Sequence, residues 1–280
     1  MIELGKYQML EVCKKTDFGV YLCEPGSANS QRILLPLKEV PEQAKLNDLI
    51  KVFVYKDSED REIATTTDVP ITVGGTAVLK VKQTTKIGAF LEWGLMKDLL
   101  LPFKEQTYKV NEGDNVLVAL YIDKSNRLCA TMKVYDFLLS DSNYKLGDLV
   151  SGIVYDRIDA FGTFVAVDNI YSALIPNNEL FKPLQNGEVI KARVAGIRED
   201  NKLTLSLRDK SYIQMDTDAE MILQNLVDEE DGFLPFHDKS NAEDIKNKFQ
   251  LSKNAFKRAI GKLYKNGTIT IEDDGIRLKK

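Results

Sequence analysis

The feature of this sequence that most constrains its fold is a unit of about 65 residues that occurs three times in succession. Each copy contains a glycine among bulky apolar residues, a short apolar run that ends in proline, an acidic residue, and a basic residue that opens a last apolar run. These positions are Gly19, Pro36, Asp48 and Arg61 in the first copy, Gly88, Pro102, Asp114 and Arg127 in the second, and Gly162, Pro176, Glu188 and Lys202 in the third. Three copies predict three small domains that share one fold.

The spacing between these positions is nearly constant. The distance from glycine to proline is 17, 14 and 14 residues, and the distance from proline to the acidic residue is 12 in every copy. The acidic residue precedes the basic one by 13, 13 and 14 residues. The three additional residues of the first copy fall in segment 24–30, whose Gly, Pro, Ser and Asn content predicts a lengthened hairpin loop.

Within each copy, short β-branched and aromatic runs alternate with turn residues, without helical periodicity. The strands predicted in the third copy are 150–156, 162–167, 173–175, 188–197 and 202–206. Polar turns are expected between the last two strands of each copy, at 58–60, 124–126 and 199–202. Five strands in about 65 residues suit a small closed barrel of the OB type, so the chain is predicted to be mainly β.

After the third copy the apolar pattern changes to a helical period. A first helix is expected to stop at 228–232, Ser240 and Glu243 have capping-box spacing for a second, and Ser252 is expected to cap a third. The buried stripe predicted for the third helix is Ala255, Phe256, Ala259, Ile260, Leu263 and Tyr264. Alternating apolar runs on both sides of 272–274 predict a hairpin. Three helices and a hairpin are typical of an α+β winged helix.

These patterns predict four modules. They are OB domains at 1–69, 70–142 and 143–212 and a winged-helix domain at 213–280. Their net charges are −3, +1, 0 and −2, so nucleic-acid binding would have to come from local patches. The N-terminus lacks a signal-peptide pattern, and no apolar stretch approaches the roughly 18 residues of a membrane helix. We therefore expect a cytoplasmic protein without membrane attachment.

Catalytic and metal sites have little support in the sequence. His237 is the only histidine, and we expect it on the surface of a loop or edge strand. Cys13, Cys23 and Cys129 have no CxxC spacing, so reduced core thiols are expected. The chain contains no GxxxxGK[ST] or GxGxxG motif. We expect no enzyme activity, no metal and no cofactor.

The third copy resembles the S1 RNA-binding domain. The segments that carry the resemblance are Phe-Gly-Thr-Phe-Val at 161–165, Ala-Leu-Ile-Pro at 173–176, the run 187–194 and Leu-Ser-Leu-Arg at 205–208. Three S1-like copies followed by a winged helix resemble, over the whole chain, the bacterial conserved virulence factor B family. This resemblance implies a cytoplasmic RNA-binding protein without catalytic activity that modulates gene expression, including virulence-associated genes in pathogens.

In the S1 pattern, aromatic residues that flank the glycine stack on bases. The matching residues are Phe18 and Tyr21, Ile87 and Phe90, and Phe161 and Phe164, so the second copy has lost one aromatic ring. Residues three apart share a face of a strand only if it is bulged, and we expect the bulge at the intervening glycine. The histidine that is common after the third strand's Gly-Leu-Val is replaced by Pro36, Pro102 and Pro176. Barrel core is the alternative role of the phenylalanines, and exposure of their rings decides between the two.

The candidate RNA-binding residues combine these aromatics with basic side chains. In the third module they are Phe161, Phe164, Arg157, Lys191, Arg193 and Arg208. On the third helix, which has no acidic residue between Ser252 and Asn266, they are Lys253, Lys257, Arg258, Lys262 and Lys265. Weaker candidates are Phe18, Tyr21, Phe90, Lys82 and Lys86. A solvated basic face is the alternative role of these cations.

The prediction is a monomeric protein that binds single-stranded RNA on the third barrel and the basic helix, which act as one composite surface. One alternative is a regulator that binds duplex DNA through the winged helix, with the barrels as accessories. Another is a protein-interaction scaffold that binds no nucleic acid, as the acidic first module and the missing histidines suggest.

Overall fold

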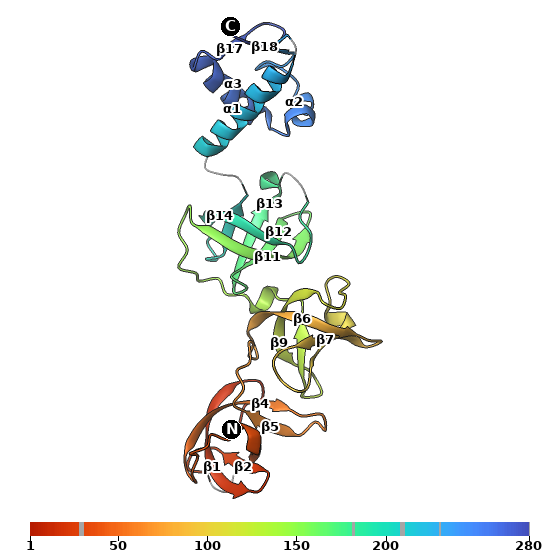
Figure 1. Ribbon diagram of the computed structural model, residues 1–280, viewed down its shortest axis with the longest axis vertical. Coiled ribbons are helices and arrows are strands. Elements are labelled where there is room, and N and C mark those ends of the chain that lie inside the picture. The colour runs from red at the N-terminus through yellow and green to blue at the C-terminus, as the bar shows by residue number, and fades with distance from the viewer. Residues whose placement is uncertain (28–30, 181–182, 208–210, 230, 280) are drawn as a thin grey trace. The chain divides into compact units, whose positions relative to one another are not determined.

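A computed structural model describes residues 1–27, 31–180, 183–207, 211–229 and 231–279 (Figure 1). The chain forms two compact units. The first comprises Met1–Asn177 and Leu184–Leu205, and the second comprises Asn178–Pro183 and Ser206–Lys280. The domain boundaries expected after residues 69, 142 and 212 stay predictions. Among the described residues, no helix is both long and apolar enough to span a membrane.

The first unit contains three closed barrels of five strands, which confirms the predicted fold. The first barrel has β1 (Tyr7–Thr16), β2 (Gly19–Cys23), β3 (Ile33–Pro36), β4 (Leu49–Lys56) and β5 (Glu62–Thr65). The second has β6 (Thr76–Thr84), β7 (Gly88–Glu92), β8 (Leu99–Pro102), β9 (Asn115–Ile122) and β10 (Leu128–Thr131). The third has β11 (Leu149–Ile158), β12 (Gly162–Val167), β13 (Tyr171–Pro176), β14 (Val189–Ile197) and β15 (Leu203–Ser206). In every barrel the third strand pairs in parallel with the fifth.

Short 3-10 helices and tight turns connect these strands. The 3-10 helices are η1 (Leu37–Glu39), η2 (Phe103–Glu105), η3 (Tyr135–Phe137) and η4 (Asn177–Glu179). The expected polar turns before the fifth strands are present, with Asp60, Asn126 and Asn201 at φ 61°, 56° and 61°. Asp and Asn tolerate this left-handed conformation better than most residues do, which explains their recurrence there. Residues 28–30 of the predicted long loop lie outside the described residues.

A glycine opens the second strand of every barrel and lies opposite the proline that ends the third strand. The pairs are Gly19 with Pro36, Gly88 with Pro102, and Gly162 with Pro176. The glycines have φ values of +150°, +151° and +134°, which other residues rarely adopt. A Cβ atom at any of them would lie 2.2 Å from a carbonyl oxygen of the third strand. Only glycine therefore fits at this position of the repeat.

The first and second barrels share a buried aromatic cluster. Phe53 of β4 is fully buried, and its ring centroid lies 5.4 Å from that of Tyr7 and 6.0 Å from that of Trp93. The Tyr7 hydroxyl donates a hydrogen bond to Asp68 Oδ1 at 2.9 Å. Trp93 is thus buried in the contact, whereas Tyr7 is partly buried and its polar end keeps a partner. The two barrels are joined by a continuous core.

A smaller apolar cluster joins the second and third barrels. Its buried members are Leu117 and Ala119 of β9, Val134 and Leu138 beside η3, and Tyr155 and Ala166 of the third barrel. Phe137 and Phe164 pack against this cluster and are partly buried. The segment that leaves the second barrel is therefore fixed on both sides of η3.

The second unit contains the predicted three helices and hairpin. Its elements are α1 (Ser211–Asp228), β16 (Phe233–Leu234), α2 (Ala242–Phe249), α3 (Lys253–Lys265), β17 (Ile269–Ile271) and β18 (Ile276–Leu278). Strand β16, which the pattern did not predict, pairs with β18 and makes the sheet three-stranded. The core includes Ile222, Ile245 and Phe256, one residue from each helix.

The helix caps follow the sequence with one exception. Ser252 caps α3 as expected, because its Oγ accepts a hydrogen bond from a backbone N–H of the first turn. The prediction that Ser240 caps α2 is wrong by one residue, since Asn241 Oδ1 accepts from Glu243 N at 2.8 Å. Ser240 instead accepts a hydrogen bond from the backbone N–H of His237. Asparagine and serine cap helices equally well, so their order alone did not identify the cap.

We predict that Gly162→Ala lowers the free energy of unfolding by about 2–4 kcal/mol, because the new methyl group would collide with the Ile175 carbonyl at a strained φ. Urea unfolding would measure the loss. Gly196→Ala in β14 of the same barrel is the matched control, since its nearest neighbour would lie 3.8 Å away. Equal effects of the two substitutions would contradict the steric argument.

We predict that Phe53→Ala costs about 3–5 kcal/mol, because it opens a cavity between the first two barrels. Trp93 is the only tryptophan of the chain and contacts Phe53, so its fluorescence would shift to longer wavelength as water enters. Phe103→Ala removes an exposed ring of the second barrel and serves as control. An unchanged Trp93 spectrum in Phe53→Ala would show that this contact does not join the barrels.

Candidate nucleic-acid interface

One position of the repeat presents a large apolar side chain to solvent in all three barrels. Phe18, Ile87 and Phe161 are 57%, 60% and 63% exposed. Each directly precedes the glycine that opens the second strand. Exposed apolar side chains at equivalent places of three barrels serve no core, so they are candidates for ligand contact.

The residue three positions later is partly buried in each barrel. These residues are Tyr21, Phe90 and Phe164. The expected bulge at the intervening glycine is wrong. The register shift lies instead in the first strand, where Cys13, Lys82 and Tyr155 are the additional residues. The earlier aromatic precedes the strand, so residues three apart need no bulge between them to line one surface.

Phe161 and Phe164 line a pocket of about 250 Å³ on the third barrel, together with Tyr135, Tyr155, Asp156 and Ile158. The Phe164 ring lies 6.0 Å from Tyr135 and 6.1 Å from Tyr155, measured between ring centroids. Tyr135 belongs to η3, outside the repeated unit, and the sequence pattern did not point to it. The repeat could not reveal it because the contact joins segments about 30 residues apart.

The predicted cations of the third barrel are not all near these aromatics. Arg157 is exposed, follows Asp156 of the pocket, and pairs with Asp159 at 3.4 Å. Lys191 and Arg193 lie on β14 opposite Ser151 and Leu149, whereas Phe164 lies opposite Asp156. They are therefore at the other end of β11 from the pocket. Arg208 lies outside the described residues.

A cation that was not among the candidates lies beside the pocket. Lys202 Nζ donates a hydrogen bond of 2.9 Å to the Tyr135 hydroxyl and lies 3.5 Å from Asp200 Oδ2. The hydrogen bond to Tyr135 raises the pKa of Lys202, so the ammonium stays charged at neutral pH. The sequence identified Lys202 only as the residue that opens the last strand.

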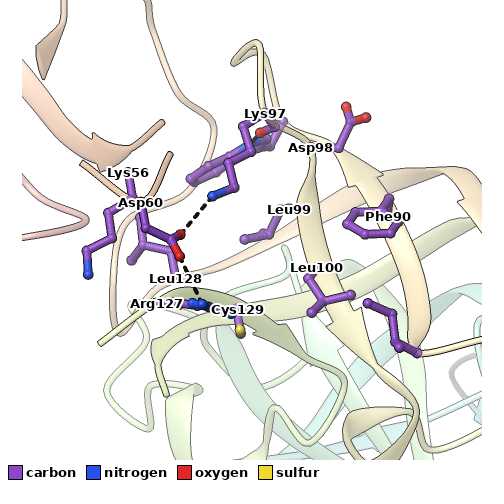
Figure 2. Close-up of a pocket in the computed structure, with 12 residues that line it drawn as sticks. Lys56, Asp60, Phe90, Lys97, Asp98, Leu99, Leu100, Arg127, Leu128 and Cys129 are labelled. Carbon is purple, nitrogen blue, oxygen red and sulfur yellow. Dashed lines mark hydrogen bonds and ion pairs between the residues drawn. The ribbon is translucent and has the colours of Figure 1, made fainter. Parts of the chain in front are cut away.

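The second barrel has a pocket of about 230 Å³ at the corresponding face, lined by Ile87 and Phe90 (Figure 2). One wall comes from the first barrel: Asp60 of the β4–β5 turn lies 3.2 Å from Lys97 Nζ and 2.9 Å from Arg127 Nη2. The hydrogen bond from Lys97, with the charge of Arg127, holds the pKa of the Asp60 carboxyl below its usual value. A single carboxylate of the first barrel thus pairs with two cations of this pocket.

Among the weaker candidates, Phe90 shares the pocket of the second barrel with Lys97 and Arg127. Lys82 pairs with Asp98 at 3.0 Å, and Lys86 is exposed. In the first barrel Phe18 and Tyr21 meet edge to face at 6.3 Å.

Helix α3 carries the predicted basic side chains on its outer face. Lys257, Arg258 and Lys265 are exposed, whereas Lys262 is partly buried. Lys253 is also partly buried and donates a hydrogen bond to the Lys239 carbonyl at 3.2 Å. The expectation that Tyr264 is buried is wrong, because it is 58% exposed. It lies one helical turn beyond Ile260 at the border of the apolar stripe, where the spacing does not decide its side.

The described part of the chain has no group of three or more His, Cys, Asp and Glu side chains placed to hold a metal ion. Cys23 and Cys129 are buried and Cys13 is partly buried, all as free thiols. Burial raises the pKa of the Cys129 thiol to about 11, so it is protonated at neutral pH. The surfaces described above present aromatic rings and cations.

Comparison with known proteins identifies the families that the parts of this chain match. Residues 4–67 and 73–133 match the family model of the S1 domain, 141–209 match the second domain of virulence regulatory factor CvfB, and 220–278 match the CvfB-like winged helix domain. A crystal structure of a multidomain protein with nucleic acid binding domains from Streptococcus pneumoniae TIGR4 is 27% identical, with a TM-score of 0.50. The match covers 99% of this chain and 98% of that one.

Relatives align along nearly their whole length. YitL of Bacillus subtilis (strain 168) is 32% identical over 99% of this chain and 94% of its own. Conserved virulence factor B of Staphylococcus epidermidis is 32% identical over 99% of this chain and 95% of its own. The Staphylococcus aureus (strain MRSA252) protein of that name is 30% identical over 99% and 94%. With its three barrels and winged helix, this protein belongs to the conserved virulence factor B family.

Proposed function

We propose that this protein binds single-stranded RNA through the aromatic pocket of the third barrel and the basic face of α3, and thereby modulates gene expression. The observation that carries the proposal is the pocket lined by the exposed Phe161 and the partly buried Phe164. Unpaired bases stack on such rings, and each stacked base contributes about 1–3 kcal/mol. Paired bases of a duplex do not offer their faces, so the pocket favours single strands.

The names of the related proteins support the proposed role in nucleic-acid binding and gene expression. The Streptococcus pneumoniae protein is described as having nucleic acid binding domains, and the staphylococcal relatives are named virulence factors. We extend both properties to this chain as part of the proposal. The proposed role is cytoplasmic and requires no catalysis, metal or cofactor.

Charge opposes phosphate binding by the first barrel, and exposed cations favour it on α3. The segment 1–69 has a net charge of −3, which opposes phosphate binding. In the second barrel, Asp60 already pairs with Lys97 and Arg127. On α3, by contrast, Lys257, Arg258 and Lys265 are exposed. Because the third barrel and α3 belong to one chain, a strand held by either meets the other at raised effective concentration.

Binding of duplex DNA by the winged helix is a second candidate function, favoured by the cations of α3. The acidic residues Glu272, Asp273 and Asp274 between β17 and β18 oppose it, because that turn would approach phosphates. Competition of duplex DNA with labelled single-stranded RNA separates the two functions. If neither is retained at low salt, the scaffold alternative remains.

We predict that Phe161→Ala weakens binding of a labelled single-stranded RNA of about 12 nucleotides roughly tenfold, because one stacking surface is lost. Fluorescence anisotropy of the full-length chain would measure the change. Phe18→Ala at the equivalent position of the first barrel is the matched control, and its affinity should stay close to that of the unmodified protein. A loss of equal size in both variants would refute the assignment to the third barrel.

We predict that replacing Lys257, Arg258 and Lys265 together by Gln lowers the slope of log K against log salt by about 2, since each phosphate contact with a single strand contributes roughly 0.7. The control replaces the exposed Lys14, Lys38 and Lys45 of the first barrel by Gln. If the slope is the same in both triple variants, α3 does not contact phosphate.

A further inference from the structure

The aromatic pocket of the third barrel includes a residue from outside that barrel. Tyr135 lies in η3, four residues after the last strand of the second barrel. We propose that Tyr135 is an RNA-binding residue that forms an additional aromatic wall of the base pocket, so that the site is shared between two barrels. This inference rests on the proposed function and specifies where a base would bind.

The ring contacts place Tyr135 in the pocket rather than in a core. Its centroid lies 6.0 Å from that of Phe164 at an interplanar angle of 82°. Tyr135 nevertheless stays 46% exposed. The Lys202 ammonium lies 4.6 Å from the ring centroid, so a base would contact the part of the ring that Lys202 and Phe164 leave exposed. Phe164 contacts Tyr155 on the third barrel as well, at 6.1 Å. The rings of Tyr135, Tyr155 and Phe164 come from three segments and line one pocket, which Phe161 extends toward solvent.

Both neighbours of η3 hold Tyr135 in position. Val134 is fully buried and Leu138 nearly so, in the apolar cluster between the second and third barrels. From the third barrel, Lys202 donates its hydrogen bond to the Tyr135 hydroxyl. A ring fixed in this way loses little freedom when a base stacks on it, so binding costs less entropy than it would with a mobile loop.

The lining of the pocket identifies the part of a nucleotide that would enter. Its volume of about 250 Å³ is below the roughly 300–1,000 Å³ of pockets for drug-sized ligands, which suits one planar ring. Asp156 is the charged residue of the lining, and its carboxylate would repel a phosphate. The base would therefore enter, while the phosphate stays outside the pocket, near Lys202 and Arg157, which also pair with Asp200 and Asp159.

The test compares Tyr135→Ala and Tyr135→Phe in the full-length chain, using the labelled single strand of about 12 nucleotides. Tyr135→Ala is expected to weaken binding roughly tenfold, while Tyr135→Phe, which keeps the ring, stays within about threefold of the unmodified protein. Phe103→Ala removes an exposed ring of η2 that lines no pocket described above, and should bind normally. Thermal unfolding should be similar in all three, because neither ring belongs to a buried cluster.

The outcomes separate the two proposals. Normal binding by Tyr135→Ala together with weak binding by Phe161→Ala overturns the role of Tyr135 and leaves the third-barrel site intact. Normal binding by both overturns the site itself. Equal losses in Tyr135→Ala and Tyr135→Phe also refute stacking, since they would assign the effect to the hydroxyl and its bond to Lys202.

A spectroscopic readout reports on stacking directly. Trp93 is the only tryptophan and is buried, so Tyr135→Trp adds a second fluorophore that is exposed at the pocket. A base that stacks on it quenches its emission, and the quenching should follow the binding curve. Saturating RNA without quenching would overturn the proposal.

Discussion

Each barrel depends on a close approach between two backbones that only glycine permits. Where the second strand begins, Gly19, Gly88 and Gly162 lie against a carbonyl group of the third strand, with no room for a side chain. This contact fixes the entry of the second strand. It also fixes the direction of the residue just before it, which has no core to join. The same constraint that closes the barrel therefore presents Phe18, Ile87 or Phe161 to solvent.

The three equivalent faces differ in their properties because each has different neighbours in the chain. The face of the second barrel is bounded by the first barrel, whose Asp60 pairs with both Lys97 and Arg127 (Figure 2). The face of the third barrel is bounded by the segment after the second, which brings Tyr135. In both cases the preceding barrel completes the surface. Tandem copies of one fold are thus not equivalent, because each copy meets a different partner.

The sequence predicted what depends on local spacing. Recurrent glycine, proline and turn residues specified the strands, and the period of three to four specified the helices, because both reflect contacts along or between adjacent segments. The Asp60 pairs escaped prediction because they join different copies of the repeat, and Tyr135 escaped it because it lies outside the repeated unit. Lys191 and Arg193 belong to the same repeat copy as the aromatics. The pairing of β14 with β11 nevertheless places them at the end of β11 that is remote from the pocket. Tyr264 lies at a helical border where spacing alone does not choose a side.

The aromatic junction between the first two barrels has a consequence for biosynthesis. Phe53 and Tyr55 belong to the first barrel but are covered by the second. The first barrel is complete at Thr65, whereas the second is complete only at Thr131, about 66 residues later. At roughly 5–20 residues per second, translation leaves this apolar surface uncovered for about 3–13 s on every nascent chain. During that interval the growing polypeptide, rather than the finished protein, is the form most exposed to aggregation.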